Sequence, residues 1–422
     1  MSAAPLQHST AELDAAHVVP SYGRFPLTLA RGAGARVWDE NDRAYLDFTS
    51  GIAVNSLGHA HPAMQAALAG QAAKLIHTSN LFLTRPQAEL AALLGSFIAE
   101  PGRIFFSNSG AEANEGLYKL ARKHGSAHDR YEIISLEGSF HGRTLASIAA
   151  TGQHKIKVGF GPAVPGFVNV PANLESIAAA LSPRTAAILV EPIQGEGGVR
   201  VLPADFLRGL RALCDEHGLL LLFDEVQCGL GRTGHWCGWH TCGATDVMPD
   251  AISWAKGIGG GFPLGAFWVR EHSGANSQKL SELLGPGSHG TTYGGSPLAC
   301  AAALCVLNTI AGENLMANAT ARGAQLRAAV AALESPLVRE IRGAGLLLGM
   351  EISDFRWKDQ TAADASPAAR RLTLKLLEHG LLVVPAGEQV IRLLPPLNVT
   401  AAECDEAVAL LRDVLALAEP VG

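Results

Sequence analysis

The sequence has few cysteines, no long apolar run and little excess charge, and each shortage excludes a class of protein. Seven cysteines in 422 residues, without a CxxC pair, argue against a disulfide framework, so we expect reduced and mostly buried thiols. The longest apolar stretches, such as Leu219 to Phe223, fall far short of the roughly 20 residues that a membrane span needs. A formal net charge of −6 gives no long-range attraction to nucleic acid or to anionic membranes.

The N-terminus also lacks the pattern of a signal peptide. Residues Met1 to Pro20 contain no basic region followed by an apolar block, so we expect a cytoplasmic protein. Repeats, low-complexity segments and runs of like charge are absent as well. With 48% hydrophobic residues and 46 glycines, the sequence is typical of a globular enzyme.

The hydrophobic pattern predicts an α/β fold. Arg36 to Phe48 alternates around the turn at residues 40–42, which predicts a hairpin near the N-terminus. From about residue 60, apolar strands such as Ala186 to Val190 and Leu219 to Phe223 alternate with helices such as Ala204 to His217. Strands that are apolar on both faces and joined through helices indicate a mainly parallel sheet between layers of helices.

The last hundred or so residues have a different texture. A helix over Leu315 to Leu333, short strands near Leu346 to Ile352 and Val390 to Leu394, and a helix from about Ala401 predict a smaller α+β unit. We therefore predict a large domain over residues 61–310. Residues 1–60 and 311–422 are predicted to form one small domain from both chain ends.

Two charged residues at the expected sheet edge stand out. The strand Leu219 to Phe223 runs directly into Asp224, and Lys256 stands between an apolar segment and the glycine run 257–261. Taken singly, Asp224 could be a turn or cap residue and Lys256 a solvated surface lysine. An amine in apolar surroundings, however, loses its proton more easily and becomes nucleophilic, as Schiff-base chemistry requires.

Two further segments carry candidate ligand-binding residues. The small-residue turn Ser107 to Asn114 joins a strand to a helix, and a helix N-terminus with small side chains can bind a phosphate. The segment Ser139 to Thr144 places Phe140, which could stack on an aromatic ring, near Arg143, which could pair with a carboxylate. Each segment also has a plain structural explanation, as a capped helix start or as a core phenylalanine beside a solvated arginine.

Together these motifs make the chain resemble a known family over most of its length. The most specific pair is Phe223-Asp224-Glu225-Val226-Gln227 with Lys256-Gly257. Supporting stretches are 51–59 (GIAVNSLGH), 77–80 (HTSN), 140–144 (FHGRT) and 191–198 (EPIQGEGG). The chain resembles the class III, ornithine-type aminotransferases among the fold-type I pyridoxal-5′-phosphate (PLP) enzymes, with most likeness to the acetylornithine aminotransferases.

The resemblance implies a cofactor site. Lys256 would carry PLP as a Schiff base, Asp224 would pair with the pyridinium nitrogen, and Gln227 would contact the phenolic oxygen of the ring. The remaining cofactor contacts would come from Ser109, Gly110, Ala111, Phe140 and Val226, and from Thr292 of a neighbouring subunit.

It also implies the substrates and the oligomeric state. Arg143 would bind a substrate carboxylate, Thr291 would lie near the substrate, and Glu196 with Arg392 would open for a dicarboxylate and close for the amino donor. The enzyme would be a homodimer with shared active sites, using N2-acetylornithine and 2-oxoglutarate without a metal. Succinylornithine, ornithine, 4-aminobutyrate and diamines remain alternative donors.

Other functions match parts of the sequence. Gly229 to Gly234 formally fits GxGxxG and would suggest an NAD-dependent oxidoreductase, but five residues separate it from the strand and no amphipathic helix follows. A zinc site could use residues among Cys228, His235, Cys237, His240 and Cys242, although their spacing is unusual for one. A PLP enzyme that catalyses racemisation or an intramolecular amino shift is the third alternative.

Overall fold

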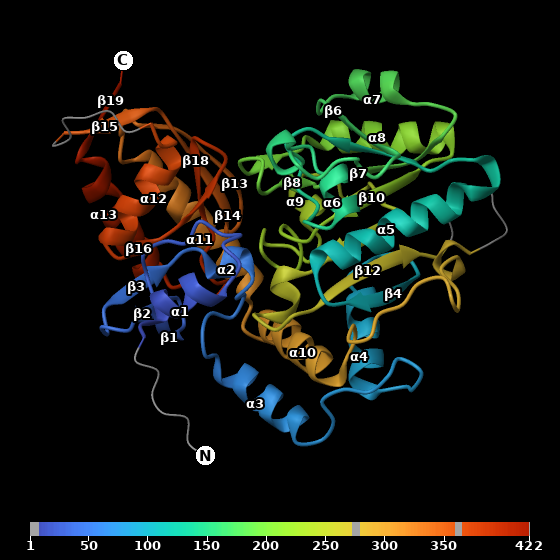
Figure 1. The fold of residues 1–422 in the computed structure, drawn as a ribbon, viewed down its shortest axis with the longest axis horizontal. Helices are drawn as coiled ribbons and strands as arrows, with labels where there is room; N and C mark the ends of the chain where they lie inside the picture. Colours follow the sequence, from blue (N-terminus) through green and yellow to red (C-terminus); the bar gives the residue numbers. More distant parts are fainter. Residues whose placement is uncertain (1–7, 272–278, 359–364, 422) are drawn as a thin grey trace.

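A computed structural model describes residues 8–271, 279–358 and 365–421, which form two lobes (Figure 1). The larger lobe contains a seven-stranded sheet. Its strands, in spatial order, are β4 (Gly102–Ser107), β12 (Gly265–Arg270), β11 (Ala251–Trp254), β10 (Leu220–Asp224), β7 (Thr185–Val190), β5 (Glu132–Leu136) and β6 (Phe167–Val170). Only β12 runs antiparallel to its neighbours within this sheet, which confirms the predicted mainly parallel arrangement.

The central strands are apolar on both faces because helices cover both. In β10, Leu221 and Phe223 join one core cluster, whereas Leu220 and Leu222 join the cluster on the opposite face. The first face packs against α4 (Arg85–Gly95), α7 (Leu174–Ala180), α8 (Ala204–His217) and α10 (Pro297–Gly312), and the second against α5 (Gly110–Gly125) and α6 (Leu145–Ala150). The period-two alternation of a strand therefore fills two cores from one sequence.

The sheet places its functional loops at one edge. Strands β4, β5, β7, β10 and β11 all point the same way, so the segments that follow them meet at the carboxyl edge. Ligands of open α/β sheets bind at this edge. Two short strands, β8 (Ile193–Gln194) and β9 (Arg200–Val201), form a hairpin after β7, and α9 (Gly238–Thr241) lies after β10.

The smaller lobe combines both ends of the chain (Figure 1). One sheet contains β1 (Leu29–Ala33), β2 (Arg36–Asp39), β3 (Ala44–Asp47) and β16 (Leu381–Leu382), and β16 pairs with β3 in parallel. A second contains β13 (Val338–Ala344), β14 (Leu347–Ile352), β18 (Val390–Leu393) and β17 (Val384–Ala386), and β15 (Phe355–Trp357) pairs with β19 (Ala418–Pro420). The helices are α1 (Thr10–His17), α2 (Ser50–Ala53), α11 (Leu315–Ala331), α12 (Ala368–Glu378) and α13 (Ala401–Leu415), while α3 (Pro62–Ala72) packs against α10.

Several of these elements match the sequence predictions. The predicted N-terminal hairpin is β2 with β3, and the predicted helix Ala204 to His217 is α8. All seven cysteines lie in the described part of the chain and are free thiols, as expected. The domain boundaries at residues 60 and 310 stay a prediction. In the described ranges no single helix is long and apolar enough to cross a membrane; α10 and α11 reach that length and apolar content only as a pair bent by 67°.

Candidate active site

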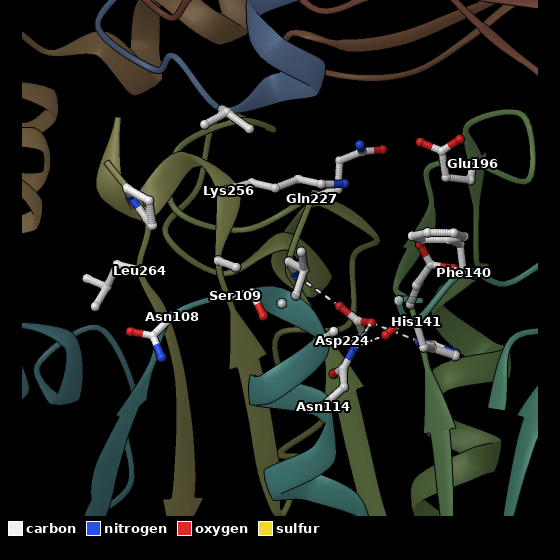
Figure 2. Close-up of a pocket in the computed structure, with 18 of the residues that line it drawn as sticks. Asn108, Ser109, Asn114, Phe140, His141, Glu196, Asp224, Gln227, Lys256 and Leu264 are labelled. Atoms are coloured by element: carbon white, nitrogen blue, oxygen red, sulfur yellow. Dashed lines mark hydrogen bonds and ion pairs between the residues drawn. The ribbon is translucent and has the colours of Figure 1, made fainter. Parts of the chain in front are cut away.

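A pocket of about 380 Å³ opens at the carboxyl edge of the larger sheet (Figure 2). Its volume is within the range of small-molecule sites. Nine of the predicted site residues line it: Ser109, Gly110, Ala111, Phe140, Glu196, Asp224, Val226, Gln227 and Lys256. Residues separated by up to 147 positions in the chain therefore meet in one cavity, because the strands that precede them end at the same edge.

Asp224, the last residue of β10, is fixed by hydrogen bonds to both carboxylate oxygens. Oδ2 lies 2.7 Å from Nδ2 of Asn114 and 2.7 Å from Nδ1 of His141, and Oδ1 accepts the backbone N–H of Val226 at 3.0 Å. Its side chain is 3% exposed. A buried carboxylate that accepts several hydrogen bonds is held in one orientation.

Lys256 lies two residues after the end of β11 and has an unusual backbone conformation. Its φ of 45° lies in the left-handed region, which few residues other than glycine adopt. Burial lowers the pKa of its amine, although the charge of Glu196 opposes this shift. The neutral, nucleophilic fraction of the amine is therefore larger than that of a surface lysine. Figure 2 shows the side chain crossing the pocket above Asp224 toward Gln227.

Helix α5 presents its N-terminus to the pocket. Ser109 caps the helix by accepting the N–H of Glu112, and the first two helical residues are Gly110 and Ala111. A Cβ at Gly110 would lie 2.9 Å from a methyl carbon of Val226, so only glycine fits without displacement. Free N–H groups and the positive end of the helix dipole suit an anion here.

Glu196 and Arg392 form an ion pair at the pocket, between the two lobes. Nη1 of Arg392 donates to Oε1 of Glu196 at 2.6 Å and to Oε1 of Gln227 at 3.3 Å. Burial would raise the pKa of Glu196, but the charges of Arg392 and Lys256 outweigh it and lower the pKa. The guanidinium, only 1% exposed, is thus neutralised by Glu196.

Four predicted substrate or cofactor residues lie outside the lining of this pocket: Arg392, which reaches it through Glu196 and Gln227, and Arg143, Thr291 and Thr292. Arg143 lies with its guanidinium carbon 5.6 Å from the centre of the Phe140 ring, close to the pocket's Phe140 wall. Thr291 and Thr292 line a separate hollow, and the hydroxyl of Thr291 accepts a hydrogen bond from Asn108 at 3.1 Å. Asn108 lines both cavities. The loop that carries the two threonines is therefore not aimed at the lysine of its own chain.

The sequence prediction assigned no role to the groups that hold Asp224. His141 and Asn114 are both 1% exposed, and the amide oxygen of Asn114 accepts the hydroxyl of Ser253 at 2.7 Å. Asn114 lies one helical turn after Gly110 in α5, which places both on one face of the helix. Two features of the sequence could have indicated these residues: the helical spacing of Asn114 from Gly110, and the position of His141 next to Phe140.

Glu191 is a further buried acid at the pocket. Its two oxygens accept the backbone N–H groups of Phe140 at 2.9 Å and of Gly195 at 3.2 Å. Burial, with a contribution from the charge of Asp224, raises the pKa of Glu191 to about 7, against the charge of His141. Glu191 thus joins the turn that carries Phe140 to the turn that carries Glu196.

Glu225 predicts a pH dependence of stability. Burial raises the pKa of this 1%-exposed carboxyl to about 7, from an ordinary value of 4.5. Between these two pKa values the folded chain keeps a proton that the unfolded chain loses. The contribution of Glu225 to the free energy of unfolding is therefore complete below pH 4.5 and is lost as the pH rises through 7. We expect Glu225→Gln to stabilise the protein at pH 8 by up to about 3 kcal/mol and to change little at pH 5.

Thermal unfolding of the wild type and Glu225→Gln at both pH values measures this effect. The glutamine can still accept the N–H of Trp239, which Oε1 of Glu225 accepts at 2.9 Å. An equal shift of the melting temperature at pH 5 and pH 8 would contradict the assignment.

The segments behind the alternative functions have no ligand-site geometry of their own. Residues 229–236 form turns closed by the N–H of Leu230 and the carbonyl of Trp236, followed by the four-residue helix α9. Among the described residues, no three His, Cys, Asp or Glu side chains converge as a metal site requires.

The chain is similar to known proteins along nearly its whole length. The family model described as aminotransferase class-III matches residues 18–415. An acetylornithine aminotransferase of Gloeobacter violaceus is 46% identical over 407 residues, which cover 95% of this chain and 96% of that protein.

Solved structures agree with the sequence comparison. The ornithine aminotransferase from Toxoplasma gondii, whose active site holds PLP at partial occupancy, has a TM-score of 0.85 at 33% identity and covers 96% of this chain and 94% of its own. The acetylornithine aminotransferase from Elizabethkingia anophelis has a TM-score of 0.80 at 32% identity, and the match covers 96% of this chain and 98% of that one. These likenesses confirm the predicted fold class, enzyme class and PLP cofactor, and the chain belongs to the class-III aminotransferases.

Proposed function

We propose that this aminotransferase moves the terminal amino group of N2-acetylornithine to 2-oxoglutarate by a ping-pong mechanism. The observation that carries the proposal is the ion pair of Glu196 with Arg392 beside the lysine. With the pair closed, the described residues of the pocket lining offer no cation other than the amine of Lys256 to a second substrate carboxylate, so a donor with a terminal amine is favoured. The names of the similar proteins, among them that of Gloeobacter violaceus, support the choice of donor.

The residues of the pocket fit PLP. The N-terminus of α5, with Gly110 and Ala111, suits the phosphate, and the carboxylate of Asp224 suits a protonated pyridine nitrogen. Nε2 of Gln227 is buried and has no hydrogen-bond partner among the described residues, so it is available to an oxygen on the ring. Phe140 lines the same cavity and would cover one face of the ring.

The chain's own groups would bind and move protons around the cofactor. PLP, when bound, supplies an aldehyde that takes up the substrate's amino group and a ring that accepts electrons. Lys256, once released by the substrate amine, would act as the base at the carbon that bears the amino group, and would return the proton to the cofactor side. Asp224 would stay ionised between Asn114 and His141 and keep the ring nitrogen protonated.

The movement of Glu196 would let one pocket distinguish the two substrates. Arg143, beside Phe140, would bind the carboxylate of the donor, leaving the terminal amine to reach Lys256. For 2-oxoglutarate, Glu196 would leave Arg392, and the freed guanidinium would bind the second carboxylate. One pocket would thus serve two substrates of different charge in turn.

We further propose a homodimer in which Thr291 and Thr292 serve the neighbouring active site. Asn80 holds this loop through hydrogen bonds to the carbonyls of Thr291 and Gly294. Next to it lies an exposed apolar group: Leu81, Phe82, Leu83 and Tyr293, with exposures from 64% to 102%. Such a group is typical of a surface that a second copy covers.

A donor screen with 2-oxoglutarate as the acceptor tests the substrate. We expect kcat/KM for N2-acetylornithine to exceed that for ornithine, 4-aminobutyrate and diamines by roughly tenfold or more, because those donors lack the acylated 2-amino group. Succinylornithine is the closest competitor and is measured beside it. A higher kcat/KM for any of these donors would replace N2-acetylornithine, and turnover without a 2-oxo acid would indicate a different PLP reaction.

A further inference from the structure

The turn that carries Glu196 is anchored to the smaller lobe at a second point. Residues 195–199 join β8 to β9, and Nε of Arg342 in β13 donates to the carbonyl oxygen of Gly198 at 2.8 Å. The same guanidinium pairs through Nη1 with Glu340 at 2.7 Å and with Glu351 at 2.5 Å. Arg342 is therefore held in place by its own lobe while it binds the turn of the other.

Arg342 and Arg392 belong to one row of the smaller lobe's sheet. Gly349 of β14 lies opposite Arg342 on one side and opposite Arg392 on the other. Side chains directly opposite one another in a sheet share a face. The two arginines therefore flank a glycine, and each holds one part of the turn: Arg392 binds Glu196, and Arg342 binds Gly198.

Val199 fills the space above that glycine. It is fully buried and has a φ of 54°, a left-handed conformation that is a true outlier for a β-branched residue. A Cβ at Gly349 would come within 2.9 Å of Cβ and Cγ2 of Val199, so the glycine makes room for the valine. A strained backbone persists only where its surroundings hold it, and it commonly marks a part that moves.

We propose that Arg342, Gly349 and Val199 position the turn and set how readily Glu196 leaves Arg392, and so determine the enzyme's preference for a dicarboxylate acceptor. The inference rests on the proposed opening of the Glu196–Arg392 pair. Loosening the anchor raises the population in which Arg392 is free, and a ligand that needs this state binds more tightly in proportion. Arg342, Gly349 and Val199 are thus positioning residues that act through Glu196.

Binding of glutarate, a dicarboxylate that cannot react, tests the inference without turnover. Titration calorimetry on the holoenzyme should show that Arg342→Leu binds glutarate roughly three- to tenfold more tightly than the wild type. Arg339→Leu is the matched control, because Arg339 lies on the same strand but donates to Ser353 of its own lobe. The ratio of the KM values for 2-oxoglutarate and for the amino donor should fall in Arg342→Leu, which loss of stability alone would not cause.

Gly349→Ala also tests whether loosening the turn frees Arg392, but it adds one methyl group instead of removing a charge. It should also tighten glutarate binding, because the added Cβ displaces Val199. Val199→Gly removes the valine side chain and accepts the left-handed backbone without strain. The double variant should then bind glutarate as Val199→Gly does, so the two changes should not add.

Glu196→Ala separates the possible outcomes. If it tightens glutarate binding while Arg342→Leu and Gly349→Ala bind like the wild type, the positioning role is overturned and the proposed function stands. If Glu196→Ala leaves glutarate binding unchanged, the proposed opening of the Glu196–Arg392 pair is contradicted, and the inference that rests on it is contradicted too. Tighter binding in Glu196→Ala, Arg342→Leu and Gly349→Ala, but not in Arg339→Leu, supports both.

Discussion

Replacing Lys256 with alanine should lower kcat by at least about 10⁴-fold, because the variant loses both the amine that binds the cofactor and the base that moves the substrate proton. The visible absorbance of the lysine-bound cofactor should disappear as well. The left-handed backbone at Lys256 fixes the start of the side chain, and burial lowers the pKa of the amine. No other lysine of the described residues lines the pocket to replace it.

Lys157→Ala provides the matched control. Lys157 also has a pKa lowered by burial, but its amine donates to the carbonyl of Ala149 at 3.2 Å and lies outside the pocket lining. This variant should keep its absorbance and its kcat within a few-fold. A Lys256→Ala enzyme that retained the visible absorbance would refute the assignment of Lys256.

The proposed sharing of active sites can be tested with the same variant. Thr292→Ala should weaken cofactor binding in both sites of a dimer, since each site would lose a phosphate ligand. When Lys256→Ala and Thr292→Ala chains are refolded together, half of the sites in a mixed dimer would have both an intact lysine and an intact threonine. Activity after mixing should therefore exceed the sum of the two variants refolded separately, and the lack of such a gain would contradict a shared site.

The sequence predicted most accurately those elements whose local pattern fits a single structure. Strand β10 is apolar on both faces and ends in an acid, so the position of Asp224 at the carboxyl edge followed from burial and chain direction alone. Helix α8 was predicted with correct bounds because its apolar face and its terminal glycine agree, and Gly218 indeed adopts a left-handed φ of 63°.

Contacts between distant segments could not be predicted in the same way. Asn114 and Asp224 are 110 positions apart, and neither segment encodes the other's place in space. The same holds for the row of Arg342, Gly349 and Arg392, which depends on the register of three strands. A pattern along one strand gives its buried face, whereas register is set by the turns and by the partner strand.

The hollow lined by Thr291 and Thr292 depends on more than the local sequence. The resemblance implied that Thr292 serves the cofactor of a neighbouring subunit and that Thr291 lies near the substrate. Within one chain both threonines line a different cavity from Lys256, and the shared site stays a prediction. The oligomer, rather than the local sequence, would then decide which lysine these threonines serve.

Replacing Asp224 with alanine should leave PLP binding measurable and lower kcat by roughly 10²- to 10³-fold. Binding would survive because Lys256 and the N-terminus of α5 remain. Turnover would fall because only a protonated ring nitrogen accepts electrons well, and the carboxylate that would hold that proton is gone. The absorbance of the bound cofactor and kcat are therefore measured on the same preparation.

The control for burial is Asp250→Ala. Asp250 is also 1% exposed, and its Oδ2 accepts hydrogen bonds from Arg211 at 2.9 Å and from the N–H of Leu221 at 2.8 Å, away from the pocket. Its loss should lower the melting temperature while kcat stays within a few-fold, since the partly buried guanidinium of Arg211 then loses one of its two carboxylate partners. Near-normal turnover in Asp224→Ala would remove the pyridinium role. If both variants lost stability and only Asp224→Ala lost turnover, the chemistry would be traced to the carboxylate that Asn114 and His141 hold.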